Sequence, residues 1–191
     1  MQNQIEQYIE ELRHACVAAR LNYEIWWLYK EKESRKRFGS TLNDYPLFFQ
    51  TSLHAHFVAM IIALYRLFET RRDTVNLPEL IKLLKKDGSI AQTNLKKFES
   101  EIMQTKVLWK KVSILRNNLF GHKANALDSD EIWKKASVTP NQFRDLINDC
   151  QRILNMVTST LNRNSHAFNL SATRDTKKLL EDLKHLNEKK L

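Results

Sequence analysis

Arginine, asparagine and histidine lie close together near the middle of the chain, in the stretch RNNLFGH at residues 116–122. These residue types suit the cleavage of a phosphodiester bond. Histidine, whose ordinary pKa is about 6.5, can take or give a proton at neutral pH. Arginine stays charged and holds phosphate oxygens through two parallel hydrogen bonds. The stretch is either an ordinary helix end or a polar site built on a helix.

Cleavage of RNA by its own 2′-hydroxyl needs these groups and no metal ion or cofactor. A base removes the hydroxyl proton, an acid protonates the leaving 5′-oxygen, and a positive charge stabilises the crowded phosphorus. We expect His122 to move protons, Arg116 to stabilise the phosphorane, and Asn117 to position one or the other. The acidic residues that follow, in DSDE at 128–131, are typical of helix caps and do not form a converging metal site.

The spacing of arginine and histidine is weak evidence by itself. With 12 arginines, 6 histidines and three permitted spacings, a chain of 191 residues gives roughly one chance match. The surrounding residues add weight, because Asn117 directly follows the arginine and Gly121 can end the helix and release His122 from its face. The structural alternative is that Arg116 pairs with a carboxylate on a neighbouring helix and His122 closes a helix end.

The chain is strongly basic, with a formal net charge of +9 and a pI of about 9.6. A basic surface attracts polyanions, so RNA is the first candidate partner, although the excess charge also serves solubility. Lys110, Lys111 and Lys123 lie near the polar stretch and are predicted to hold the RNA backbone. A solvated helix face explains these lysines equally well.

The elements that must position these residues are helices. Glycine and proline occur only three times each, which favours long helices and argues against a many-stranded sheet. The apolar periodicity predicts an all-α, single-domain bundle of five to seven helices, with a possible break near Thr105. Expected helical segments are 3–37, 44–70, a short helix opened by 76–78 and ended by 85–89, 90–119, a turn or two in SDEIWKK, 139–157 and 172–188.

We expect one domain over residues 1–191, in which 165–191 is a helical extension that packs on the bundle, packs on a partner chain, or frays.

The two cysteines, Cys16 and Cys150, fit buried thiols in a reducing compartment. His54 and His56 are two residues apart, so on a helix their side chains point to nearly opposite sides and cannot easily chelate one ion. The first twenty residues indicate no signal peptide, and the longest apolar stretch is shorter than a membrane span. These features predict a cytoplasmic protein without a membrane partner.

Three segments together resemble a known family. LRNNLFGHK (115–123), HFVAMIIALYRLFE (56–69) and NLPELIKLLKK (76–86) are similar to the AbiU-type, abortive-infection branch of the HEPN proteins, over about residues 20–160. The resemblance implies a helical bundle that dimerises face to face and a metal-independent endoribonuclease that acts as a toxin or antiphage factor. It also implies that Arg116 and His122 are the catalytic pair and that Asn117 supports them.

One feature departs from the pattern that the resemblance implies. Members paired with a nucleotidyltransferase antitoxin often carry a modified tyrosine shortly after the histidine, whereas this chain has HKAN there. An antitoxin, if one exists, is therefore expected to act differently.

The sequence also gives a reason for a homodimer. One chain supplies one histidine at the site, and a two-fold interface would bring two copies of Arg116 and His122 together. The leading hypothesis is a homodimeric endoribonuclease that leaves a 2′,3′-cyclic phosphate. The alternatives are a non-catalytic helical module that binds RNA or protein, and a nucleotide-binding accessory subunit.

Overall fold

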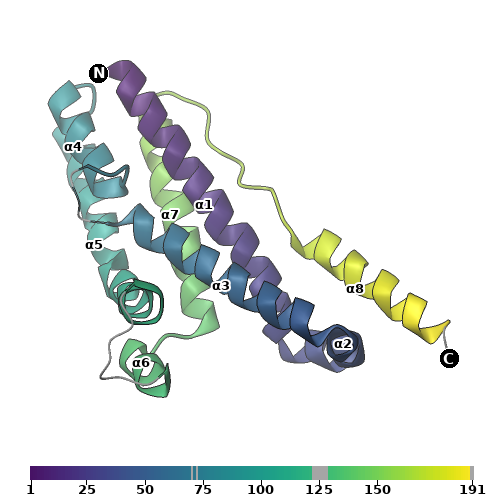
Figure 1. The fold of residues 1–191 in the computed structure, drawn as a ribbon. Helices are drawn as coiled ribbons and strands as arrows, with labels where there is room; N and C mark the ends of the chain where they lie inside the picture. The colour runs from purple at the N-terminus through teal and green to yellow at the C-terminus, as the bar shows by residue number, and fades with distance from the viewer. Residues whose placement is uncertain (70, 72, 122–128, 190–191) are drawn as a thin grey trace.

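The computed structural model describes residues 1–69, 71, 73–121 and 129–189, and in them it contains eight α-helices, one π-helical turn and no strand (Figure 1). The all-α prediction is confirmed, with one helix more than the upper expected number. The elements are α1 (Gln2–Lys30), α2 (Lys32–Asp44), α3 (Pro46–Leu67), α4 (Leu77–Asp87), α5 (Gln92–Leu115), η1 (Arg116–Gly121), α6 (Ser129–Ala136), α7 (Pro140–Thr160) and α8 (Thr173–Glu188).

Helix α1 is the centre of the bundle. α3 crosses one side of it and α7 lies along another, while the α4–α5 hairpin packs against α1, α3 and α7 (Figure 1). Buried side chains from these helices form one large apolar core, which includes Leu12, Leu64, Leu84 and Leu154. Burial of this apolar surface is the main force that holds the helices together.

The prediction of one helix over 3–37 is wrong. The backbone leaves the helical conformation at Glu31, where ψ is 136°, and a separate helix α2 carries the basic run through to Asp44. The break lets Phe38 of α2 enter a second, small apolar cluster with Tyr29, Phe49 and Leu180. Local periodicity could not reveal this cluster, because its members come from four different helices.

Helix α3 begins at Pro46, as the proline signal predicts. Its buried side chains, including Phe57, Ile61 and Leu64, face the core, and α3 packs mainly on α1. Among the described helices, α3 is the one whose length and composition would also suit a membrane span, a test that core helices pass as well. Its packing against α1 fits the predicted role of a core helix.

Helices α4 and α7 begin where their capping residues predict. The Asn76 side chain accepts a hydrogen bond from the backbone of Glu79 (2.8 Å), and Thr139 forms a complete capping box with Gln142. Gly88 ends α4 in the left-handed conformation, at φ 73°, which an L side chain rarely adopts. These caps fix both ends of α4 and the start of α7, the two helices that flank α5.

Helix α5 is continuous, so of the two alternatives for this segment the unbroken helix is the one observed, without a break near Thr105. Thr105 is buried, and its hydroxyl donates a hydrogen bond of 2.7 Å to the carbonyl oxygen of Ile102 in the preceding turn. This bond satisfies the polar side chain inside the helix, and no chain break is needed.

Both cysteines are buried and free, as predicted. Burial raises the pKa of the Cys16 thiol to about 12 and raises that of Cys150 well above its usual value. A thiol in such surroundings stays protonated and unreactive at neutral pH.

The C-terminal segment folds back on the bundle. α8 packs on α1 and α2, and Leu180 is fully buried in the second apolar cluster with Leu28 and Tyr29. Of the three expectations for this segment, packing on the bundle is the one observed in the described residues.

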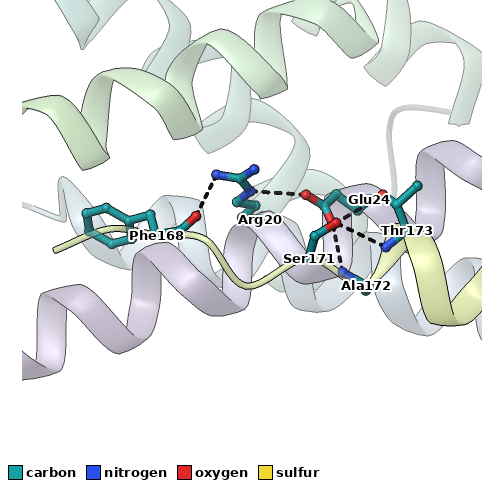
Figure 2. A network of polar contacts seen from close by, with 6 residues as sticks. All are labelled: Arg20, Glu24, Phe168, Ser171, Ala172 and Thr173. Carbon is teal, nitrogen blue, oxygen red and sulfur yellow. Dashed lines mark hydrogen bonds and ion pairs between the residues drawn. The ribbon is translucent and has the colours of Figure 1, made fainter.

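A polar network on α1 holds the start of this segment (Figure 2). The Glu24 carboxylate accepts hydrogen bonds from the Ser171 hydroxyl (2.7 Å) and from the backbone N–H of Ala172 (2.8 Å). Arg20 donates to Glu24 (3.0 Å) and to the carbonyl oxygen of Phe168 (2.8 Å). Glu24 therefore acts as an N-terminal capping group for α8, supplied by another helix.

Candidate active site

The predicted site stretch lies at the end of α5, where the helix changes type. Residues Arg116–Gly121 form a π-helical turn directly after Leu115. Such turns are rare and frequently occur at functional sites. The amide of Asn118 donates a 2.7 Å hydrogen bond to the carbonyl oxygen of Ile114, so a side chain supplies a donor where the α-helical pattern ends.

Arg116 is held on two sides. Its guanidinium lies over the ring of Tyr65 from α3, 4.6 Å from the ring centroid. Its Nη1 also donates a 3.0 Å hydrogen bond to Oδ1 of the adjacent Asn117. A cation over an aromatic face is attracted by about 0.5–2 kcal/mol, depending on exposure. Among the described residues, these contacts restrict the guanidinium and occupy one of its five N–H donors.

Tyr65 is itself braced. Its ring stacks on Trp109 of α5, with centroids 5.9 Å apart and an interplanar angle of 26°. The indole N–H of Trp109 donates to the backbone carbonyl of Tyr65 at 3.2 Å. Helices α3 and α5 are thus joined by a stack in which Arg116 lies on Tyr65 and Tyr65 lies on Trp109.

Asn117 lies beside Arg116, as predicted for a supporting residue. It is exposed, and its Nδ2 reaches the hydroxyl of Ser113 one turn earlier, at 3.5 Å. The structure therefore brings Arg116 and Asn117 together. The other member of the predicted catalytic set, His122, and the predicted RNA-binding Lys123 lie outside the described residues.

The two remaining predicted RNA-binding lysines have different surroundings. Lys110 is exposed on α5. Lys111 is partly buried and donates to the carbonyl oxygen of Ser137, just before α7, and to the side chain of Gln142 (3.1 Å) in its first turn, which ties α5 to the start of α7. Contact with RNA remains a prediction for both, and Lys111 would have to make it in addition to these bonds.

Tyr65 and Trp109 are functional candidates that the sequence did not reveal. Tyr65 belongs to the apolar pattern of α3, and nothing in its local sequence connects it with Arg116. A polar aromatic residue followed by Arg66 near the end of a core helix is the only signal, and it is a weak one.

The described residues contain no group of three or more histidine, cysteine, aspartate or glutamate side chains that could hold a metal ion. In α3, His56 is engaged instead with the Asn22 side chain, at 2.7 Å between Nδ1 and Oδ1. Burial lowers the pKa of His56, which favours the neutral ring.

Comparison with known proteins gives one family. The model of the HEPN_AbiU2 family, described as AbiU2, matches residues 2–184. No curated protein matches the chain. No solved structure matches it either.

Proposed function

Because the chain belongs to the AbiU2 family of HEPN domains, which suggests a nuclease role related to abortive infection, we propose that it is a metal-independent endoribonuclease. The proposed reaction is attack of the RNA 2′-hydroxyl on the neighbouring phosphorus, with loss of the 5′-oxygen of the next nucleotide. The products would carry a 2′,3′-cyclic phosphate and a 5′-hydroxyl. Its biological setting would be a toxin or an antiphage factor, with an antitoxin protein as a possible partner.

The placement of Arg116 is the observation that supports this proposal best. The guanidinium is fixed by the Tyr65 ring and by Asn117, at the end of a basic helix. A restrained arginine loses less side-chain entropy when it binds phosphate, and its planar N–H groups match two phosphate oxygens. It is therefore suited to stabilise the extra negative charge that develops at phosphorus in the transition state.

Proton transfer is assigned to His122 from the sequence. The histidine follows the π-helical turn directly, so it is close to Arg116 along the chain. One imidazole can serve as base or as acid in a single step, and the reaction needs both. A homodimer that places two copies of the RNNLFGH stretch in one cleft would supply both groups.

The direct test is incubation of the purified chain with total RNA in excess EDTA. We expect cleavage, with 2′,3′-cyclic phosphate ends detected by mass spectrometry. Arg116→Ala and His122→Ala should each lower the rate by about a hundredfold, because each removes a group needed in the transition state. Arg144→Ala is the matched control, since Arg144 is an exposed arginine on α7 that pairs with its neighbour Asp145.

The contact of Arg116 with Tyr65 also favours a second candidate, a non-catalytic helical module that binds RNA or protein and keeps the motif for structure. That candidate predicts that Arg116→Ala lowers the melting temperature or the dimer population and that neither the unsubstituted chain nor any variant cleaves RNA. Dependence of cleavage on Mg²⁺, or cleavage that survives both substitutions, would contradict the proposed reaction. Thermal melts and sedimentation of the same variants separate the two candidates.

A further inference from the structure

An apolar groove lies between α4 and α5, beside the end of α3, and encloses about 580 Å³. The side chains that form its apolar floor and walls are Phe68, Pro78, Ile81, Ile102, Met103 and Trp109.

The apolar surface continues out of the groove along α5. Met103 is 62% exposed and Val107 is 66% exposed, and the two residues lie one helical turn apart. Contiguous exposed apolar surface with a polar rim is typical of a site for another molecule. Hydration of Met103 and Val107 is unfavourable in the isolated chain, so covering them would favour association.

The rim of the groove is mainly basic. Lys82, Lys85 and Lys106 line it, against one acidic residue, Glu99. Lys82 is already paired with Glu79 at 2.5 Å, but its side chain remains 61% exposed. The rim therefore favours an occupant that carries negative charge along its edges.

From these features we infer that the groove binds an acidic, amphipathic helical segment of a partner protein. From Glu99 to Trp109 the wall follows about three turns of α5, or roughly 15 Å, which matches a short helix laid along it. Apolar residues at positions i, i+3, i+4 and i+7 of that helix would cover the floor, and flanking glutamates would face the lysines. This binding does not require RNA cleavage, although Trp109 of the groove also braces Tyr65 beside Arg116.

The lining argues against two other occupants. Stacking of RNA bases needs exposed aromatic faces, but Phe68 is only 4% exposed and one side of the Trp109 ring is taken by Tyr65. A second copy of the same groove would bring basic rim against basic rim, which like-charge repulsion disfavours.

The test measures binding directly, by fluorescence anisotropy. The probe is a labelled amphipathic peptide of about 14 residues, with leucines at helical spacing and glutamates on the flanks. A second peptide has lysine in place of each glutamate, and a third has the acidic composition in scrambled order. We expect the acidic amphipathic peptide to bind the full chain at least about tenfold more tightly than either control peptide.

Variants locate the binding site. Met103→Glu and Val107→Glu should each lower affinity for the acidic peptide by about tenfold. Lys85→Glu with Lys106→Glu should reverse the preference toward the lysine peptide. Leu47→Glu is the matched control for the apolar positions, because Leu47 is 79% exposed at the far end of α3. Thermal melts verify folding, which is expected because the substituted side chains lie at the surface.

Four results would overturn the inference. Equal binding of the acidic and lysine peptides would contradict charge recognition, and unchanged binding in both Met103→Glu and Val107→Glu would place the peptide elsewhere. Loss of binding to a single-stranded RNA oligonucleotide in these two variants, without peptide binding, would assign the groove to RNA. Loss of self-association in them, measured by sedimentation, would assign it to a second copy of the chain.

Discussion

At the scale of single residues, the most informative feature is the pairing of a permanent charge with an aromatic ring. Arg116 is partly buried over Tyr65 and next to the exposed Asn117. The ring supplies attraction without a carboxylate, so the positive charge of Arg116 is not neutralised by this contact. A salt bridge to an acidic side chain would have held the guanidinium equally well but would have reduced its attraction for phosphate.

Tyr65 is predicted to act as a positioning residue for Arg116. Tyr65→Phe keeps the ring face and should keep the RNA cleavage rate within about twofold, whereas Tyr65→Leu should lower kcat by about tenfold. KM should change less than kcat if Tyr65 acts only by holding Arg116 and not by binding RNA itself. The measurement is steady-state cleavage of a defined oligonucleotide, with a thermal melt for each variant.

The Phe variant also separates positioning from simple packing. If Tyr65→Leu is as active as Tyr65→Phe while both remain folded, the ring face has no role in positioning. If both variants lose activity and stability together, the contribution of Tyr65 is structural.

At the scale of elements, the π-helical turn decides how the motif residues are presented. α5 is regular to Leu115, and the change of helix type begins at the first residue of the motif. A π-helical turn has more residues per turn than an α-helix, so side chains from Arg116 onward leave the face that α5 would have given them. The end of α5 is therefore part of the candidate site and not only its support.

The attachment of α8 is predicted to depend on the ionisation of Glu24. Burial raises the pKa of Glu24, but hydrogen bonds from Ser171, Arg20 and Ala172 and the Arg20 charge more than offset it, so the net pKa is lowered. A lowered pKa in the folded state stabilises the fold above the unfolded value, about 4.5, and that stabilisation is lost as the pH falls below it. We expect α8 to loosen as the pH falls below about 4.5.

Hydrogen exchange of the α8 amides, followed from pH 7 to well below pH 4.5, measures this effect. Glu24→Gln should raise α8 exchange already at pH 7, destabilise the attachment by about 1–2 kcal/mol, and flatten the pH dependence. Glu33→Gln is the matched control, because Glu33 is an exposed glutamate on α2. An unchanged pH profile in Glu24→Gln would show that another group controls the attachment.

At the scale of the whole molecule, the net charge of the chain affects whether the proposed dimer can form. A net charge of +9 favours encounter with RNA and opposes self-association through repulsion. A stable homodimer therefore needs an interface with enough apolar burial to offset that repulsion. Repetition of the motif across a two-fold axis would concentrate the positive charge of two Arg116 side chains where the phosphate binds.

A site shared between two chains predicts that the cleavage rate depends on protein concentration. The cleavage rate per chain should fall steeply when the protein is diluted below its dimer dissociation constant, because a monomer lacks one of the two proton-transferring groups. Initial rates over a dilution series, measured beside mass photometry of the same samples, test this. A monomer with full activity per chain would contradict the shared site without contradicting the chemistry of Arg116.

The local parts of this protein were predictable from its sequence. The all-α class, the starts of α3, α4 and α7, and the buried thiols follow from proline, capping and apolar signals within a few residues of each feature. The family resemblance was also readable, because its segments occur in order along the chain. The predicted site residues Arg116 and Asn117 lie together because they are adjacent in sequence.

Only the tertiary structure decided which distant groups meet. The break at Glu31 depends on an apolar cluster from four helices, the restraint of Arg116 depends on Tyr65 from another helix, and the bonds of Lys111 depend on residues at the start of α7 and just before it. The physical reason is the same in each case. Helical periodicity and capping are set by neighbouring residues, whereas burial and side-chain contacts between helices are set by how the whole bundle packs.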